Sequence, residues 1–255
     1  MLEAMSNIAL WIDGNFEANL DVWFLPGFAE SHLCFKQVYN SEVVNIARAI
    51  VFDPPGFGAS PARAEGISIS ECAQIWSELI SKVSASRRVI LVAHSVSGIT
   101  AVETAKLLET PPELLVSIEG NLTEVDAYFS GQALNYSDPQ MFVDSFSKNV
   151  LDLVMDGKVP MSYYSSLQFA DSRTLWKMGQ STQKYKTPGL DLLQLKCPVK
   201  YYWSEESLSK ESKAFLLRYN IENFQFQGLG HWPMLASPIT FYKQLSEDIL
   251  SQVSK

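Results

Sequence analysis

The sequence of 255 residues has few cysteines and no long apolar segment, and both shortages exclude classes of protein. Its three cysteines, Cys34, Cys72 and Cys197, are too scattered for a disulfide framework or a cysteine-rich zinc site. We therefore expect small buried thiols in a reducing compartment. No apolar run reaches the roughly 18 residues that a membrane span requires. The first residues, MLEAMSNIALWIDGN, lack the basic start and long apolar core of a signal peptide, so a cytoplasmic location is expected.

Long runs of one charge are also missing. The chain has 28 acidic and 20 basic residues, which gives a formal charge of −8 at pH 7. Such a surface repels phosphate backbones and anionic lipid, so nucleic acid is not an expected partner. No pattern predicts a metal or a cofactor, and the oligomeric state is not predicted. The 47% hydrophobic content is enough for the full core of one α/β domain.

Apolar strands alternate with amphipathic helices along most of the chain. Strand patterns cover residues 7–13, 20–27, 47–53, 87–95, 114–120, 198–204 and 223–228. Asp13-Gly14 predicts a hairpin between the first two strands. A helix is indicated by an apolar stripe from Cys72 to Val83, and Ser68 and Glu71 have capping-box spacing at its start. This alternation predicts an α/β fold with a doubly wound, mostly parallel sheet.

Residues 122–187 break this alternation. They contain no strand pattern and are rich in aromatic residues and methionine, which indicates several helices. An insertion at this place is expected to form a helical cap (lid) beside the strand ends, where open α/β sheets bind ligands. The predicted division is therefore a core of residues 1–121 and 188–255 with a cap of residues 122–187.

The stretch LVAHSVSGIT, residues 91–100, places Ser95 at a sharp corner between a strand and a helix. The chain folds back on itself there, so the positions two before and two after the serine must be small. Ala93 and Ser97 meet this requirement, although the usual pattern has glycine at both. The alternative is a serine that only caps the following helix.

At this point the sequence resembles the α/β-hydrolase superfamily, in particular serine esterases and thioesterases with a helical cap. FLPGF (residues 24–28) is similar to the oxyanion loop, with Pro26 where histidine is common, and DPPGFGAS (residues 53–60) resembles the D-x-P-G-x-G-x-S turn. GLGHWPMLASP (residues 228–238) resembles the segment that carries the catalytic histidine. The resemblance implies Ser95 as nucleophile and an oxyanion hole made by the backbone N–H groups of Phe28 and Val96.

A serine nucleophile needs a general base, and the chain has three histidines. The resemblance assigns the base to His231, which follows a strand in a glycine-rich loop. His94 adjoins the nucleophile and is expected to pack away from it. His32 is expected to be a loop histidine, with the rim of the pocket as the alternative.

The third catalytic residue is an acid that orients the histidine, and its position departs from the family pattern. Where the commoner arrangement of the family has an Asp, this chain has Ser207, and a serine carries no charge. Some members carry the acid after an earlier strand, which favours Glu119 at the end of the strand LLVSI. Glu205 and Glu206 are the alternative acids, and a site without a true acid is the remaining alternative.

These residues predict a serine hydrolase that cleaves a carboxylic ester or thioester through an acyl-enzyme, without a cofactor. The aromatic and methionine-rich insertion favours an apolar acyl or aryl group, so the expected partner is a small apolar ester-like substrate. Two alternatives stay open. One is C–C bond hydrolase, lyase or cyclase chemistry on the same scaffold, and the other is a catalytically weak small-molecule-binding protein.

Overall fold

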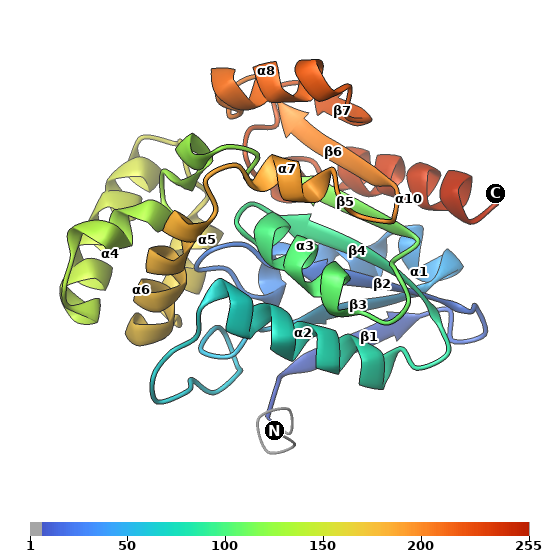
Figure 1. The fold of residues 1–255 in the computed structure, drawn as a ribbon, viewed down its shortest axis with the longest axis horizontal. Helices are drawn as coiled ribbons and strands as arrows, with labels where there is room; N and C mark the ends of the chain where they lie inside the picture. The colour runs from blue at the N-terminus through green and yellow to red at the C-terminus, as the bar shows by residue number, and fades with distance from the viewer. Residues whose placement is uncertain (1–6, 255) are drawn as a thin grey trace.

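A seven-stranded sheet lies at the centre of the computed structural model, which describes residues 7–254 (Figure 1). The strand order is β1-β3-β2-β4-β5-β6-β7, and every neighbouring pair is parallel except β1 and β3. The strands are β1 (Leu10–Gly14), β2 (Leu20–Leu25), β3 (Arg48–Phe52), β4 (Arg88–His94), β5 (Leu114–Ile118), β6 (Val199–Ser204) and β7 (Asn223–Phe226). The expected mostly parallel α/β sheet is confirmed. Residues 1–6 of the segment judged not to be a signal peptide lie outside the described residues.

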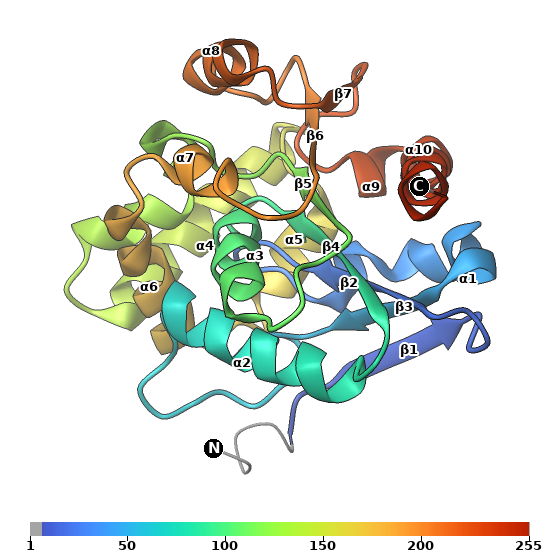
Figure 2. The ribbon, with the colours of Figure 1, turned by 45° about the vertical axis from the view of Figure 1, so that its right-hand side comes forward.

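Helices cover both faces of this sheet (Figure 2). One face carries α2 (Ile69–Val83) and α3 (Ser97–Leu107), and the other carries α1 (Val43–Ile46) and α10 (Pro238–Val253). The apolar stripe of α2 is buried from Cys72 to Ile80, and its predicted capping box is confirmed: the Glu71 N–H donates to Ser68 Oγ and the Ser68 N–H to Glu71 Oε2. The remaining core helices are η2 (His32–Cys34), η3 (Lys36–Asn40), α7 (Pro188–Leu192), α8 (Lys210–Tyr219) and α9 (Pro233–Ala236). Every residue of β2 and β5 is buried, and burial on both faces explains why these strands are mostly apolar.

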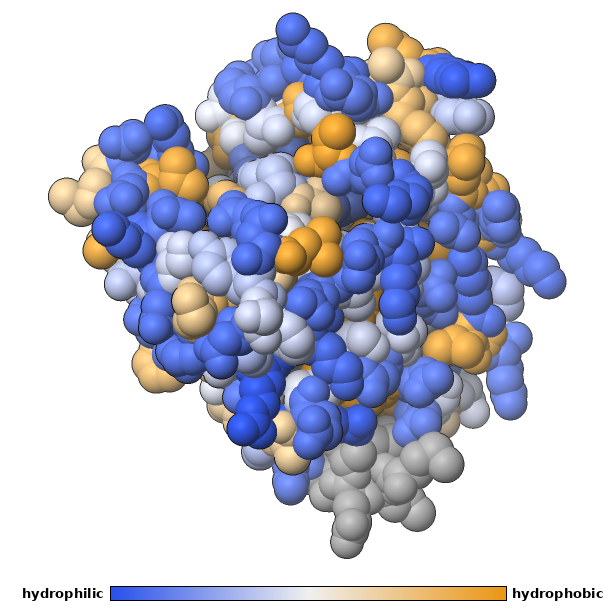
Figure 3. All heavy atoms as spheres, turned by 60° about the vertical axis from the view of Figure 1, so that its left-hand side comes forward, coloured by the Kyte–Doolittle hydropathy of each residue, from blue (hydrophilic) through white to orange (hydrophobic). Residues whose placement is uncertain are grey.

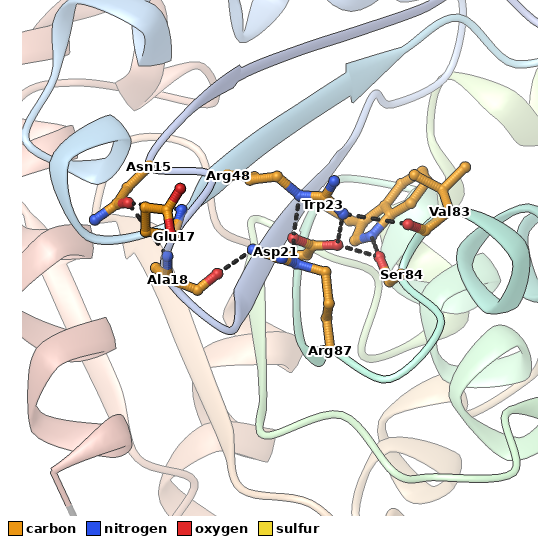
Figure 4. Close-up of polar contacts among 9 residues, drawn as sticks. All are labelled: Asn15, Glu17, Ala18, Asp21, Trp23, Arg48, Val83, Ser84 and Arg87. Atoms are coloured by element: carbon orange, nitrogen blue, oxygen red, sulfur yellow. Dashed lines mark hydrogen bonds and ion pairs between the residues drawn. The ribbon is translucent and has the colours of Figure 1, made fainter.

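The hairpin predicted at Asp13-Gly14 is wrong. β1 pairs with β3, antiparallel, and β2 crosses to lie between β3 and β4. The connection between β1 and β2 is longer than a two-residue turn. Within it, the side chain of Asn15 accepts hydrogen bonds from the N–H groups of Glu17 and Ala18 (Figure 4). β2 thereby pairs along both of its edges, with β3 and with β4.

Asp21 anchors the amino end of β2 (Figure 4). Its buried carboxylate accepts hydrogen bonds from Arg48 Nε at 2.7 Å, Arg87 Nε at 2.8 Å and Ser84 Oγ at 2.5 Å. Burial alone raises the pKa of Asp21, but the bonds from Arg48, Ser84 and Arg87 outweigh it and hold the pKa below its usual value. Ser84 also accepts from Trp23 Nε1, so one carboxylate joins β2, β3, the end of α2 and the start of β4.

A helical insertion separates β5 from α7. It comprises η4 (Glu124–Ala127), η5 (Ser130–Asn135), α4 (Pro139–Met155), α5 (Met161–Leu167), α6 (Ser172–Ser181) and η6 (Thr182–Lys184), and it projects from one side of the core (Figure 1). Phe142 and Phe146 stack in its interior with ring centroids 5.4 Å apart. Apolar side chains also reach its surface, among them Met141, Met155, Met161 and Phe169. Figure 3 shows the apolar residues of one face as separate patches among hydrophilic ones. Phe142, Phe146 and Tyr163 are buried, so part of the aromatic content serves the packing of the insertion itself.

Candidate active site

Ser95 occupies the corner between β4 and α3 that the sequence predicts. Its backbone is left-handed, with φ of +54°, a conformation that costs energy for a residue other than glycine. The Ser95 N–H donates to Ile118 O at 2.9 Å, and its carbonyl accepts from the Gly98 N–H at 2.8 Å. Ser97, which stands where the family pattern has glycine, donates its Oγ–H to the carbonyl of Pro26. This substitution therefore ties the start of α3 to the loop after β2.

Two backbone N–H groups beside Ser95 have no hydrogen-bond acceptor. They belong to Phe28, in the loop after β2, and to Val96, and within residues 7–254 neither donates a hydrogen bond. Both residues line the same cavity as Ser95. Ala29, the neighbour of Phe28, is also left-handed, with φ of +61°. The two amides are the donors that the sequence predicts for an oxyanion hole.

Glu119 is the carboxylate that pairs with His231 among the described residues. Glu119 Oε2 is 3.4 Å from His231 Nδ1, and the Glu119 side chain is 1% exposed. Glu119 Oε1 accepts from the Ser204 N–H at 2.6 Å, which fixes the carboxylate at the end of β6. The Glu119 backbone is left-handed, with φ of +48°. A separation of 3.4 Å is long for a hydrogen bond, as catalytic contacts often are before a substrate binds.

The alternative acids lie on the surface. Glu205 and Glu206 are both exposed, and Glu205 Oε1 binds Lys213 Nζ at 2.6 Å. Neither makes an ion pair with His231 among the residues that the structure describes.

The other two histidines have different surroundings. His32 stacks on Trp11 with ring centroids 3.7 Å apart, and its Nδ1 is 2.9 Å from Asp53 Oδ1, outside the Ser95 cavity. His94 is buried, and its Nδ1 is 2.9 Å from Glu30 Oε2. The sequence reasoning missed Glu30. A single carboxylate inside the apolar segment FLPGFAES was the available signal.

Burial and partner charges oppose each other in the pair of Glu30 and His94. Burial alone raises the pKa of Glu30 and lowers that of His94. The attraction between the two, together with their hydrogen bonds, outweighs burial, so the pKa of Glu30 falls below its usual value and that of His94 rises. Both shifts favour the ionised form of the pair.

The strand ends and the insertion enclose a small cavity around Ser95. We call it the Ser95 cavity; it is lined by Phe28, Glu30, His94, Ser95, Val96, Asn121, Asp126, Tyr128, Phe129, Ser130, Tyr163, His231 and Trp232. It leaves about 10 Å³ for the centres of water-sized molecules, which is room for roughly one water. Tyr163 is 4% exposed, and its hydroxyl has no hydrogen-bond partner among the described residues. Tyr128 is 48% exposed and lies at the mouth, with its ring centroid 6.2 Å from that of His231.

Residues 7–254 lack two further features. No cluster of three His, Cys, Asp or Glu side chains there could hold a metal ion. No helix in the described part of the chain is long and apolar enough to cross a bilayer.

Residues 24–244 match the sequence profile of the Alpha/beta hydrolase family. The chain belongs to this family. Membership supports a hydrolase as the class of enzyme and confirms the fold and the resemblance noted from the motifs. Comparison with curated protein sequences finds no match.

Solved structures of this fold superpose over almost the whole chain. A thermophilic esterase from Thermogutta terrifontis is 15% identical with a TM-score of 0.76, and 96% of this chain covers 93% of that one. A mutant of the N-acyl homoserine lactonase AidH, complexed with N-hexanoyl homoserine lactone, is 14% identical with a TM-score of 0.75. The match covers 97% of this chain and 95% of that one. A hydrolase from Pseudomonas aeruginosa PA01 is 14% identical with a TM-score of 0.73, covering 97% and 94%. At such identities the likeness establishes the fold alone.

Proposed function

We propose that this protein is a serine hydrolase that cleaves a small carboxylic ester or thioester through an acyl-enzyme. The observation that carries the proposal is the convergence on one cavity of Ser95, His231 and two unpaired backbone amides, with Glu119 Oε2 3.4 Å from His231 Nδ1. Nucleophile, base, acid and oxyanion donors are together the parts that acyl transfer requires.

In the first half of the reaction, Ser95 Oγ attacks the carbonyl carbon of the substrate while His231 Nε2 takes the hydroxyl proton. The carbonyl oxygen becomes negative and receives hydrogen bonds from the N–H groups of Phe28 and Val96, each worth about 3 kcal/mol in the transition state. Glu119 accepts the Nδ1–H bond of His231 and stabilises the imidazolium. When the tetrahedral intermediate collapses, the C–O or C–S bond breaks and the His231 proton passes to the leaving group.

The second half returns the enzyme to its starting state. His231 takes a proton from water, the resulting hydroxide attacks the acyl carbon, and the bond to Ser95 Oγ breaks with return of the proton to the serine. The carboxylic acid product leaves, and no cofactor takes part.

Size and lining favour a compact substrate. Phe28, Phe129, Tyr163 and Trp232 surround the Ser95 cavity with rings, which suits a short acyl or an aryl group. The unpaired Tyr163 hydroxyl is a donor without an acceptor, and a substrate oxygen or nitrogen within its reach would satisfy it. The esters and lactones named for the similar structures are compatible with this polar requirement.

The helical insertion acts in this proposal as a cap. Tyr128, Phe129, Ser130 and Tyr163 reach from it into the Ser95 cavity, and the cavity holds about one water. A substrate therefore enters only when this lining moves, and Tyr128 is its most exposed member.

The proposal is tested first by intact mass after treatment with a fluorophosphonate. A single adduct is expected on the wild type and none on Ser95→Ala, with strongly slowed labelling of His231→Ala. Ser60→Ala is the matched control, because Ser60 Oγ donates to Asp53 O and lies outside the cavity. A panel of short acyl and aryl esters and thioesters then defines the substrate. A folded wild type that forms no adduct and turns over no ester would refute the proposal and favour a small-molecule-binding role, and turnover that survives Ser95→Ala would favour the related C–C bond, lyase or cyclase chemistry.

A further inference from the structure

The buried ion pair of Glu30 and His94 has no part in the proposed chemistry, yet it bonds to the segments that carry Phe28, Ser95 and His231. The two side chains are 3% and 1% exposed. Glu30 Oε2 accepts from the Gly27 N–H at 2.6 Å and from His94 Nδ1 at 2.9 Å, and Glu30 Oε1 accepts from Trp232 Nε1 at 2.6 Å. His94 Nε2 is 2.8 Å from the carbonyl oxygen of His231.

Each contact lies at, or next to, a group that the reaction uses. Gly27 precedes Phe28 of the oxyanion hole, His94 precedes Ser95, and the carbonyl bound by His94 belongs to the base itself. The loops after β2, β4 and β7 are far apart in the sequence and meet on this one pair. From this we infer that Glu30 and a doubly protonated His94 are positioning residues that hold the Phe28 amide, Ser95 and His231 in register; the inference rests on the proposed function.

The hydrogen-bond partners of His94 indicate its charge. The His231 carbonyl can only accept, so His94 Nε2 must carry a hydrogen. Both oxygens of Glu30 already accept N–H donors, from Gly27 and Trp232, as expected of a carboxylate. His94 Nδ1 facing that carboxylate then donates as well, and the ring is an imidazolium. The pKa directions agree, because the attraction of Glu30 outweighs burial and raises the pKa of His94.

Other titratable groups face the pair. The carboxylate of Glu119 also raises the pKa of His94, and the rings of His94 and His231 are 4.8 Å apart between centroids. Burial first, and then the charge of Glu30, raise the pKa of Cys34 and Tyr163, so both stay neutral. His94 is therefore the cation that balances Glu30 in this pocket.

Gly27 shows how tightly the pair is enclosed. A Cβ added there would lie 2.9 Å from both Glu30 Oε2 and His94 Nδ1, closer than packed side chains allow. Only a glycine lets its N–H reach Glu30 while the imidazole occupies the adjacent space.

Two substitutions of His94 separate its two bonds. In His94→Gln the amide can replace Nε2 and keep the bond to the His231 carbonyl, whereas in His94→Asn it can replace Nδ1 and keep the bond to Glu30. Glu30→Gln removes the charge and keeps the size. We expect each variant to slow phosphonylation of Ser95 by about 10-fold or more, since small displacements of reacting groups are costly. His32→Asn is the matched control: it makes the same substitution at a histidine outside the cavity, where Asn can keep the bond to Asp53, and it should label within about 2-fold of wild type.

Nitrogen NMR of the imidazoles tests the charge without any activity. The chain has three histidines, so single substitutions assign every signal. At pH 7.5 both ring nitrogens of His94 should be protonated in the wild type, and Glu30→Gln should lower the pH at which His94 loses its proton. Amide exchange at Phe28 and Trp232 should be faster in the folded His94 variants than in the wild type.

A neutral His94 at pH 7.5 would overturn the inference, and so would folded variants that label and exchange like the wild type. If the wild type is not phosphonylated at all, the proposed function fails, and the NMR titration and amide exchange still decide whether the pair is charged and holds the loops. If the variants do not fold, the wild-type titration decides alone.

Discussion

Replacing Glu119 with glutamine should disable the enzyme through the proton position on His231. Glu119 Oε1 accepts the Ser204 N–H at 2.6 Å, and Oε2 faces His231 Nδ1 at 3.4 Å. In Glu119→Gln only the carbonyl oxygen can accept the Ser204 N–H, so the amide NH₂ must turn toward His231. Two donors cannot face each other, and Nδ1 would have to become an acceptor.

That change places the hydrogen of His231 on Nε2, the atom that must accept the Ser95 proton. The imidazole is then held in the wrong tautomer although its position is kept. An equivalent change in a serine protease triad lowers kcat by about 10⁴-fold, or roughly 5 kcal/mol in the barrier. We expect a loss of about 10³-fold to 10⁴-fold here.

The assay is kcat for the best ester found in the panel, together with the rate of phosphonylation. Glu205→Gln and Glu206→Gln are the matched controls, because both side chains are exposed, and they should stay within about 2-fold of wild type. A fully active Glu119→Gln, or a large loss in either control, would refute the reasoning and place the acid after β6.

Three further outcomes follow from the structure. Tyr163→Phe should leave the midpoint of thermal unfolding unchanged or higher, because it removes a buried unpaired hydroxyl, while kcat/KM falls by about 10-fold; a fall in stability would contradict this. Asp21→Asn should lower the free energy of unfolding by about 3 kcal/mol and the midpoint by roughly 6–12 °C in calorimetry, with unchanged kcat. The pKa of Glu30 is lowered from 4.5 and that of His94 is raised from 6.5. The pair therefore contributes fully to the free energy of unfolding between pH 4.5 and pH 6.5, and this contribution is lost as the pH rises through the folded-state pKa of His94. The stability difference between wild type and Glu30→Gln in urea should therefore be larger at pH 5.5 than at pH 9, and a constant difference would argue against a charged pair.

Local patterns predicted most of the fold. Apolar runs and the capping box at Ser68 depend on near neighbours, so the strands and α2 were read correctly from the sequence. Strand order depends on pairings between distant segments, and Asp13-Gly14 consequently predicted a hairpin that the sheet does not form.

The same distinction applies to the candidate site. Ser95, His231 and Glu119 each follow a strand, and the resemblance to a family with catalytic residues at such positions was enough to propose them. Glu30 and Tyr163 left only weak sequence signals, because their surroundings come from loops and helices far away in the chain. A buried carboxylate is informative only when its partner is known, and here the partner is 64 residues distant.

The two ends of the sheet have opposite energetic roles. At the carboxyl end, Ala29, Ser95 and Glu119 are all left-handed, and each such residue costs on the order of 1–3 kcal/mol. They follow β2, β4 and β5, which are adjacent in the sheet, so the strain is concentrated around the Ser95 cavity. At the amino end, Asp21 fastens β2 to β3 and to the start of β4 through two arginines and Ser84. The anchor and the strain share β2 and β4, so the bonds of Asp21 at the amino end offset part of the cost of the left-handed residues that follow the same strands.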